Sequence, residues 1–253
     1  MTAEQLEMIK AILPTSLGSD EIRAAISADI LRQSVFSARM TNARYLQQVQ
    51  AVCAQVAGGG MNLADARAVL TRTLRNMGHD TANAHGITDP ASRRRIDLIV
   101  KTRTEMAANA ARVNSQTAAT CYAYPAWQLV RYGTRRMPRD WPARWKAAGN
   151  AVGWVGAAQD STEMVALKDS PIWQALGNGA GGYRDTLGNP YPPFAFSSGM
   201  DWSGVRRPRC IALGLITADT PPQVPERVSV APSDEEIAEA SQRAGMDLAG
   251  ELQ

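Results

Sequence analysis

The distribution of aromatic residues divides this chain into two parts. All six tryptophans lie between Trp127 and Trp202, whereas residues 1–120 contain only Phe36 and Tyr45 as aromatic side chains. Aromatic rings bury large apolar areas and dominate the packing of a core. The first part must therefore build its core from aliphatic residues. A chain of 253 residues is long enough for two modest domains, and we expect two domains of different construction.

Apolar residues in the first part recur at the spacing of helices. The predicted helices cover residues 1–13, 20–57, 63–76 and 91–119. Ser19 is the expected cap of the second helix, and the glycines from Gly58 onward end it. At 1.5 Å per residue this helix would be roughly 55 Å long. Because its apolar stripe is thin, we expect it to pack against its own chain or a neighbouring subunit.

The second part is rich in tryptophan and proline and has few long periodic runs. We expect strands near 127–132, 154–158 and 164–167, short helices near 141–148 and 172–176, and a glycine-rich surface loop over 177–182. Residues 221–232 resemble a linker, and Ser233 opens a capping box for an acidic helix that ends between 245 and 252. The predicted fold class is α+β and predominantly α-helical: a long-helix N-terminal half and a compact irregular C-terminal half. The predicted domains are 1–120, 121–220 and 221–253.

Charge is distributed unevenly. Residues 88–150 contain 12 Lys or Arg against 4 Asp or Glu, and residues 221–253 contain 2 against 7. Arginine suits the bidentate recognition of phosphates and carboxylates. The candidates for binding a polyanion, either DNA or an acidic protein ring, are Arg94, Arg95, Arg103, Arg135 and Arg136. The alternative is that these arginines solvate helix faces and stack on nearby tryptophans. Any DNA contact would involve the backbone without reading the sequence.

The residue types that catalysis requires are poorly represented. The three cysteines are far apart and lack a C-x-x-C spacing, and His79 and His85 are the only histidines. No zinc spacing, phosphate-binding loop or nucleophile elbow is present. We therefore expect no enzymatic activity, no metal and no cofactor. An alternative remains: a hydrolase or transferase whose carboxylates come from Asp160, Glu163, Asp169, Asp185 and Asp201.

The sequence also shows no pattern typical of a signal peptide or a membrane span. The N-terminus has no basic segment before an apolar run, and no stretch is apolar for long enough to cross a bilayer. We expect no membrane partner.

Residues 187–196 combine three aromatic side chains with three prolines, which stiffen the chain. Asn189-Pro190 favours a turn, and Pro192-Pro193 favours an extended path that leads into Phe194. This segment is either a buried loop that closes the second core or a rigid arm whose aromatic rings enter a partner. Trp141, Trp145 and Phe194 are the candidates for anchoring the fold or an interface.

Three segments together resemble the phage head-morphogenesis family, the minor head proteins of the Mu-F-like type. They are the helix over 96–110 with its Arg103-Thr104-Glu105, the aromatic stretch from Pro125 through Trp145, and the segment from Asn189 through Met200. The resemblance covers about residues 20–216. Members often carry an Asp, Arg and His-containing segment after the Arg-Thr-Glu helix. This chain has no histidine there, so no catalytic or metal role is carried over.

The resemblance implies a low-copy component of the virion, assembled in the host cytoplasm. Its expected partners are the portal or the major capsid protein and, without sequence specificity, packaged DNA. Its expected role is in head assembly, packaging or genome delivery, with several copies in an assembly. Besides the hydrolase or transferase, a cytoplasmic nucleic-acid-binding module remains an alternative.

Overall fold

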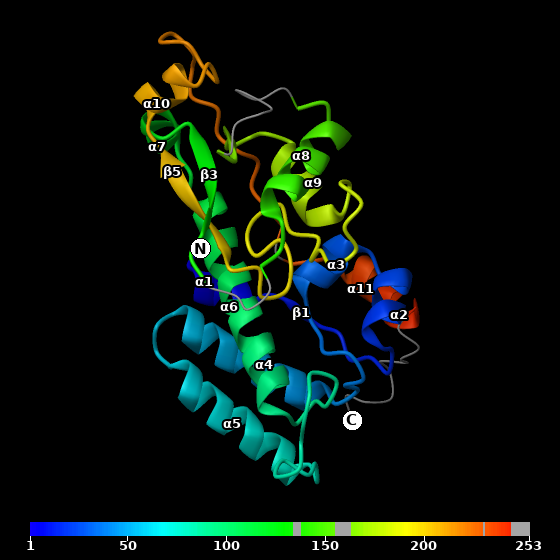
Figure 1. Ribbon diagram of the computed structural model, residues 1–253. Helices are drawn as coiled ribbons and strands as arrows, with labels where there is room; N and C mark the ends of the chain where they lie inside the picture. Colours follow the sequence, from blue (N-terminus) through cyan, green and yellow to red (C-terminus); the bar gives the residue numbers. More distant parts are fainter. Residues whose placement is uncertain (134–137, 155–162, 230, 244–253) are drawn as a thin grey trace. The chain divides into compact units, whose positions relative to one another are not determined.

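The computed structural model describes residues 1–133, 138–154, 163–229 and 231–243. Helices dominate these residues, and two small sheets accompany them (Figure 1). This confirms the predicted α+β, predominantly helical class. The contacts divide the chain into two compact units: unit 1 comprises 1–111 with 229–253, and unit 2 comprises 112–228. The boundary expected near residue 120 therefore lies near 111, and the expected third segment, 221–253, is split between the two units.

Unit 1 is built from helices and one pair of two-residue strands. The elements are α1 Ala3–Met8, β1 Ala11–Ile12, α2 Ser19–Ala25, α3 Ala28–Gln33, β2 Ser34–Val35, α4 Ala43–Ala57, α5 Leu63–Asn76, α6 Arg93–Asn114, whose last turn belongs to unit 2, and α11 Asp234–Arg243. Strands β1 and β2 pair in parallel. Helix α5 has the bounds that its spacing predicts.

The prediction of one helix over 20–57 was wrong. Ile26 is extended, and Ser27 then starts α3 by accepting a hydrogen bond from the backbone N–H of Ile30. The chain is extended again at β2, and Asn42 starts α4 by accepting from the N–H of Tyr45. Helices α3 and α4 each have their own side-chain cap, so a continuous backbone ladder is not needed to satisfy their free N–H groups. The expected cap of the first piece was wrong, because Gly18 is the N-cap of α2 and Ser19 is its first residue. The expected long arm does not form.

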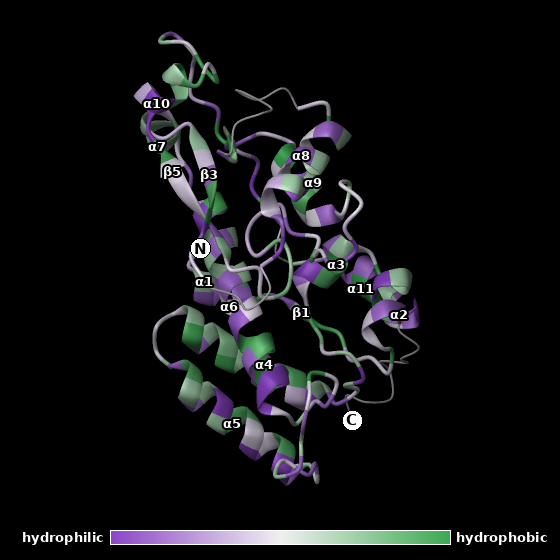
Figure 2. Cartoon of the chain, in the orientation of Figure 1, coloured by the Kyte–Doolittle hydropathy of each residue, from purple (hydrophilic) through white to green (hydrophobic). Residues whose placement is uncertain are grey.

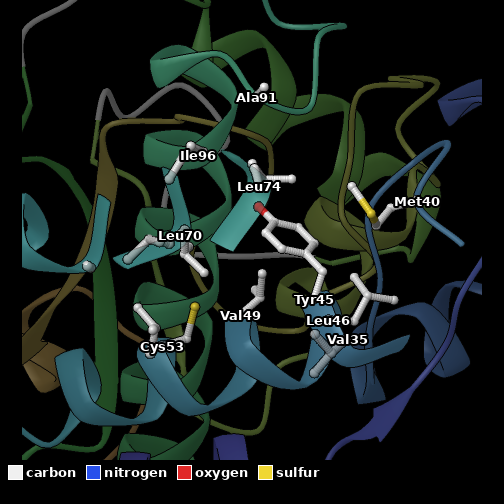
Figure 3. Packing of buried hydrophobic residues seen from close by; sticks show 13 residues of the cluster. Val35, Met40, Tyr45, Leu46, Val49, Cys53, Leu70, Leu74, Ala91 and Ile96 are labelled. Atoms are coloured by element: carbon white, nitrogen blue, oxygen red, sulfur yellow. The ribbon is translucent and has the colours of Figure 1, made fainter. Parts of the chain in front are cut away.

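The main core of unit 1 lies between α4, α5 and α6. Figure 3 shows Tyr45, Val49 and Cys53 of α4 facing Leu70 and Leu74 of α5. These residues recur at intervals of three and four, and hydrophobic and hydrophilic residues alternate along α5 (Figure 2). The pieces of the expected long helix thus bury their apolar faces within their own unit.

A smaller core attaches the acidic terminal helix. Ala240 of α11 is buried together with Ile22, Ile26 and Ile30 of the α2–α3 region. Ser233 caps α11 as predicted, since its hydroxyl accepts from the N–H of Glu236 and its own N–H donates to the Glu236 carboxylate. Residues 244–253, where this helix was expected to end, lie outside the described residues.

Unit 2 contains a three-stranded antiparallel sheet with short helices. The elements are α7 Ala118–Ala123, β3 Ala126–Arg131, α8 Trp141–Ala151, β4 Val165–Leu167, α9 Ile172–Asn178, β5 Met200–Val205 and α10 Arg207–Ala212. The strand order is β4-β3-β5, with Leu129 opposite Trp202. The strand predicted near 154–158 falls almost wholly on residues that are not described. None of the helices in the described part of the chain is long and apolar enough to cross a membrane.

Residues 187–196 form a largely buried loop. Asn189, Tyr191 and Phe194 are almost completely buried, so the interpretation as a loop that closes the core is correct and the protruding arm is not observed. Gly177 lies in the last turn of α9 rather than in a surface loop. A Cβ atom there would lie 1.7 Å from the carbonyl oxygen of Asn189, so the loop can approach only a glycine.

Candidate functional site

The first candidate residues are the consecutive arginines at the start of α6. Arg93 lies 3.7 Å from the Asp97 carboxylate, and Arg95 donates to the Ile87 carbonyl and to the Ser37 hydroxyl. Burial lowers the pKa of Arg95. Arg94 is exposed and makes no hydrogen bond or ion pair with the described residues. Of these three arginines, Arg94 is therefore the one positioned to meet a polyanion.

Arg103 does not lie at the surface. Its side chain is buried in unit 1, where Nε donates to Glu7 Oε1 at 2.5 Å and Nη1 donates to the Ser34 carbonyl at 2.9 Å. The prediction that Arg103 binds a polyanion is therefore corrected: its partner is an internal carboxylate. The spacing explains this position, because Arg103 falls on the same helical stripe as the buried Val100 and Ala107.

Arg103 is part of a buried polar cluster, which we define as Glu7, Lys10, Gln50 and Arg103. Lys10 Nζ lies 2.9 Å from the second Glu7 oxygen. Gln50 of α4 donates to the backbone carbonyls of Glu7, at 3.1 Å, and Lys10, at 2.7 Å. Burial, followed by the positive charge of Arg103, lowers the pKa of Lys10, although Glu7 opposes this shift. The cluster thus joins the N-terminal helix to α4 and α6.

The arginines of unit 2 are also engaged with their own chain. Arg139 and Arg144 both contact the Asp185 carboxylate, at 2.8 Å each. Partial burial acts to raise the pKa of Asp185, but hydrogen bonds from Arg144 and Arg139 and their charges lower it overall. Arg135 and Arg136 lie outside the described residues. Among the residues that the structure describes, most Lys and Arg side chains of 88–150 therefore contact groups of their own chain.

The three aromatic candidates form the core of unit 2. Trp141, Trp145 and Phe194 are 1%, 6% and 0% exposed. Trp173 links them, with its ring centre 5.2 Å from Trp145 and 6.3 Å from Phe194. Trp173 also contacts Trp202, which stacks on Trp127 at 3.8 Å. These residues anchor the fold, and their rings are not available to a partner.

The carboxylates of the alternative enzymatic hypothesis do not converge. Glu163 pairs with Arg209 at 2.7 Å, Asp185 pairs with Arg139 and Arg144, and Asp201 pairs with Arg112 at 3.1 Å. Asp160 is not described. Within the described ranges, no three His, Cys, Asp or Glu side chains form a group that could hold a metal ion. Glu163, Asp185 and Asp201 are thus each paired with arginines of their own, and nothing in the described residues brings these acids together in one group.

The three cysteines are buried and free. Burial and then the charge of Glu7 raise the pKa of Cys53 to about 12, and burial raises the pKa of Cys210. A buried thiol that keeps its proton is a poor nucleophile. This agrees with the interpretation of the cysteines as packing residues.

The sequence did not single out the exposed aromatic residues of α7. Tyr122 and Tyr124, which directly follows α7, are 54% and 40% exposed, whereas the two tryptophans and the phenylalanine proposed above are buried. Cys121 is the buried residue of α7, and the helix contains no charged side chain that would mark its exposed face in the sequence.

Comparison with known proteins gives no relative. No protein-family model, curated protein or solved structure matches the chain.

Proposed function

We propose that this chain is a structural protein of a phage head, of the minor-head type, which acts in head assembly through contacts with the portal or the major capsid protein. The proposal starts from the three segments that resemble the Mu-F-like minor head proteins. Two of them are aromatic segments far apart in the sequence, and both enter the core of unit 2. Trp141 of one packs against Phe194 of the other, with ring centres 6.4 Å apart. This packing is the observation that carries the proposal, because it gives both segments one shared structural role.

Two arguments from the sequence no longer support the proposal. The expected long helix is divided into pieces that bury their apolar residues within unit 1, so it does not demand a neighbouring subunit. Among the five arginines expected to bind a polyanion, Arg103 is buried and Arg95 is held by local acceptors. We therefore base the proposed function on contacts with proteins and give DNA a smaller part.

The test is the composition of assembled particles. Heads and DNA-filled virions are purified by density gradient from the phage that encodes the chain, and each structural protein is quantified by mass spectrometry. We expect the chain at a fixed, low ratio to the portal in both kinds of particle. A mutant that lacks the chain should yield fewer infectious particles, and a plasmid copy should restore the yield. A chain found only in the soluble fraction would contradict the proposal.

DNA binding is measured separately with the purified protein. An affinity that falls steeply with salt would indicate several phosphate contacts, since each contact releases a counterion. We expect a shallow dependence, because most of the described Lys and Arg side chains of residues 88–150 already contact their own chain. A slope that corresponds to six or more phosphate contacts would instead favour the nucleic-acid-binding alternative.

A further inference from the structure

Two exposed aromatic residues of unit 2, Tyr122 and Tyr124, lie just before strand β3, at the same end of the sheet. Helices α7 and α10 flank the same end of the β3–β5 pair (Figure 1). Tyr122 at the end of α7 is 54% exposed, Tyr124 just after it is 40% exposed, and Ile211 of α10 is 39% exposed. We name Tyr122, Tyr124, Arg206 and Ile211 the α7–α10 surface.

Tyr122 is held in place by a buried arginine. The guanidinium carbon of Arg207 lies 4.3 Å from the centre of the Tyr122 ring. Arg207 is itself fixed, because Nη2 donates to the carbonyls of Ala218, at 2.9 Å, and Thr220, at 2.6 Å. The cation–π contact covers part of the ring and leaves more than half of the residue exposed. Tyr122 therefore has a defined position before any partner binds.

Tyr124 is fixed by a close approach to the sheet. Its ring lies over Gly204 of β5, where a Cβ atom would be 3.2 Å from Cδ1 of the tyrosine. The N–H of Tyr124 closes α7 by donating to the Thr120 carbonyl at 2.9 Å. A glycine at position 204 thus gives the ring room on the strand. Two exposed rings held in this way lose little conformational entropy when they are covered.

The charges around these rings limit what can bind there. Residues 115–125 and 203–214 contain three arginines and no acidic residue. Arg207 donates hydrogen bonds to backbone carbonyls that follow α10, and Arg209 pairs with the Glu163 carboxylate at 2.7 Å. Arg206 is exposed and has no partner among the residues that the structure describes. The surface therefore offers two rings, one aliphatic side chain and one available cation.

A single available cation is too few for a nucleic acid. Binding to a phosphate backbone typically uses about 6 to 10 phosphate contacts. Tyrosine and arginine within a weakly charged surface are instead the residues that dominate the affinity of protein interfaces. Helix α7 itself contains no charged residue. The composition of the α7–α10 surface thus favours a protein partner over DNA or RNA.

We infer that the α7–α10 surface is a docking site for a protein segment that presents a carboxylate to Arg206 and small apolar side chains to Tyr122, Tyr124 and Ile211. This inference rests on the proposed function, which makes the portal or the major capsid protein the owner of that segment. It goes further by assigning the contact to one surface of unit 2 and by stating the chemistry of the partner.

The test measures how many copies of each variant enter the heads of a phage that lacks its own copy of the chain. Arg206→Glu reverses the charge at the surface, and Tyr124→Ala removes a ring. Arg184→Glu is the matched control, since Arg184 is also exposed in unit 2 and has no partner among the described residues. We expect Arg206→Glu and Tyr124→Ala to enter heads in about tenfold fewer copies than the wild-type chain, and Arg184→Glu to enter heads in the normal number.

Two outcomes separate the inference from the proposed function. If the wild-type chain is absent from heads, the proposed function fails and the inference fails with it. If the wild-type chain is present and Arg206→Glu and Tyr124→Ala enter at the same level, only the inference fails. Thermal unfolding of the purified variants, unchanged from wild type, excludes misfolding as the cause of a loss.

A photoreactive amino acid at position 124 then identifies the occupant in assembled heads. A crosslink to a peptide of the portal or major capsid protein that contains Asp or Glu is the expected result. A crosslink to DNA, or to a second copy of this chain, would overturn the inference. The same amino acid at position 184 serves as the control and should give no such crosslink.

Discussion

The two units join their elements by opposite chemistry. Unit 1 places a polar cluster, Glu7, Lys10, Gln50 and Arg103, where its N-terminal helix meets α4 and α6. Unit 2 joins its sheet, its helices and the loop that carries Phe194 through one aromatic cluster around Trp173. Removal of one partner of a buried charged side chain strongly lowers stability, because the remaining charge is left uncompensated. Replacement of one core ring by another of similar size costs less. The two centres should therefore respond differently to conservative substitution.

The largest loss is expected for Trp173→Ala. Trp173 is 2% exposed, contacts four other rings and donates from Nε1 to the Leu167 carbonyl at 2.8 Å. Removal of the ring leaves a cavity and removes one of the two hydrogen bonds that the Leu167 carbonyl accepts, which should lower the free energy of unfolding by about 4 kcal/mol. Urea unfolding followed by the fluorescence of the other tryptophans, all in unit 2, measures this. Trp173→Phe should lose less than half as much, and an equal loss would contradict the tolerance for ring exchange.

The polar centre of unit 1 is tested with Arg103→Met, for which we expect a loss of about 3 kcal/mol. The loss is smaller than for Trp173→Ala because Lys10 still compensates the Glu7 charge. Amide hydrogen exchange in peptides from α4 reports the change within unit 1. Arg94→Met, at an exposed position of the same helix, should stay within about 0.5 kcal/mol. A loss below about 1 kcal/mol for Arg103→Met would show that the cluster is not important for stability.

The comparison also shows what the sequence could predict. Helix α5, strand β3 and the cap at Ser233 follow from local spacing and capping residues, which act within a few positions of the chain. The break between α2 and α4 carried the same kind of signal, because Ser27 and Asn42 are good caps in the middle of the expected helix. That error came from giving periodicity more weight than capping.

The function of individual arginines was harder to predict. Arg103 lies on an apolar helical stripe, which indicates burial, but its partner Glu7 is 96 residues away. Arg139 and Arg144 likewise meet Asp185 only through the tertiary fold. A count of charges along the sequence gives the net excess. It does not give the fraction that is already neutralised within the fold, and that fraction decides whether a basic surface exists.

A smaller effect is expected where the loop of unit 2 meets α9. Gly177→Ala places a Cβ atom 1.7 Å from the Asn189 carbonyl oxygen, so the loop must move away from the helix. Overpacking of this kind costs about 2 kcal/mol. Gly133→Ala is the control in the same unit, since its Cβ atom would find ordinary contacts at 3.5 Å. Equal midpoints of urea unfolding for the two variants would show that the loop adapts without cost.

The smallest effect concerns how completely unit 1 excludes water from its centre. Burial, and then Glu7, raise the pKa of Cys53 from 9.0 to about 12. The folded state therefore keeps the thiol proton at a pH where the unfolded state loses it. The stabilisation is complete below pH 9 and is lost as the pH rises, by about 1 kcal/mol between pH 9 and pH 10. Cys53→Ala removes this group, so the difference in stability between wild type and variant should shrink by that amount over this range. A constant difference would mean that the thiol ionises equally in both states, and the interior around the polar cluster would then be open to water.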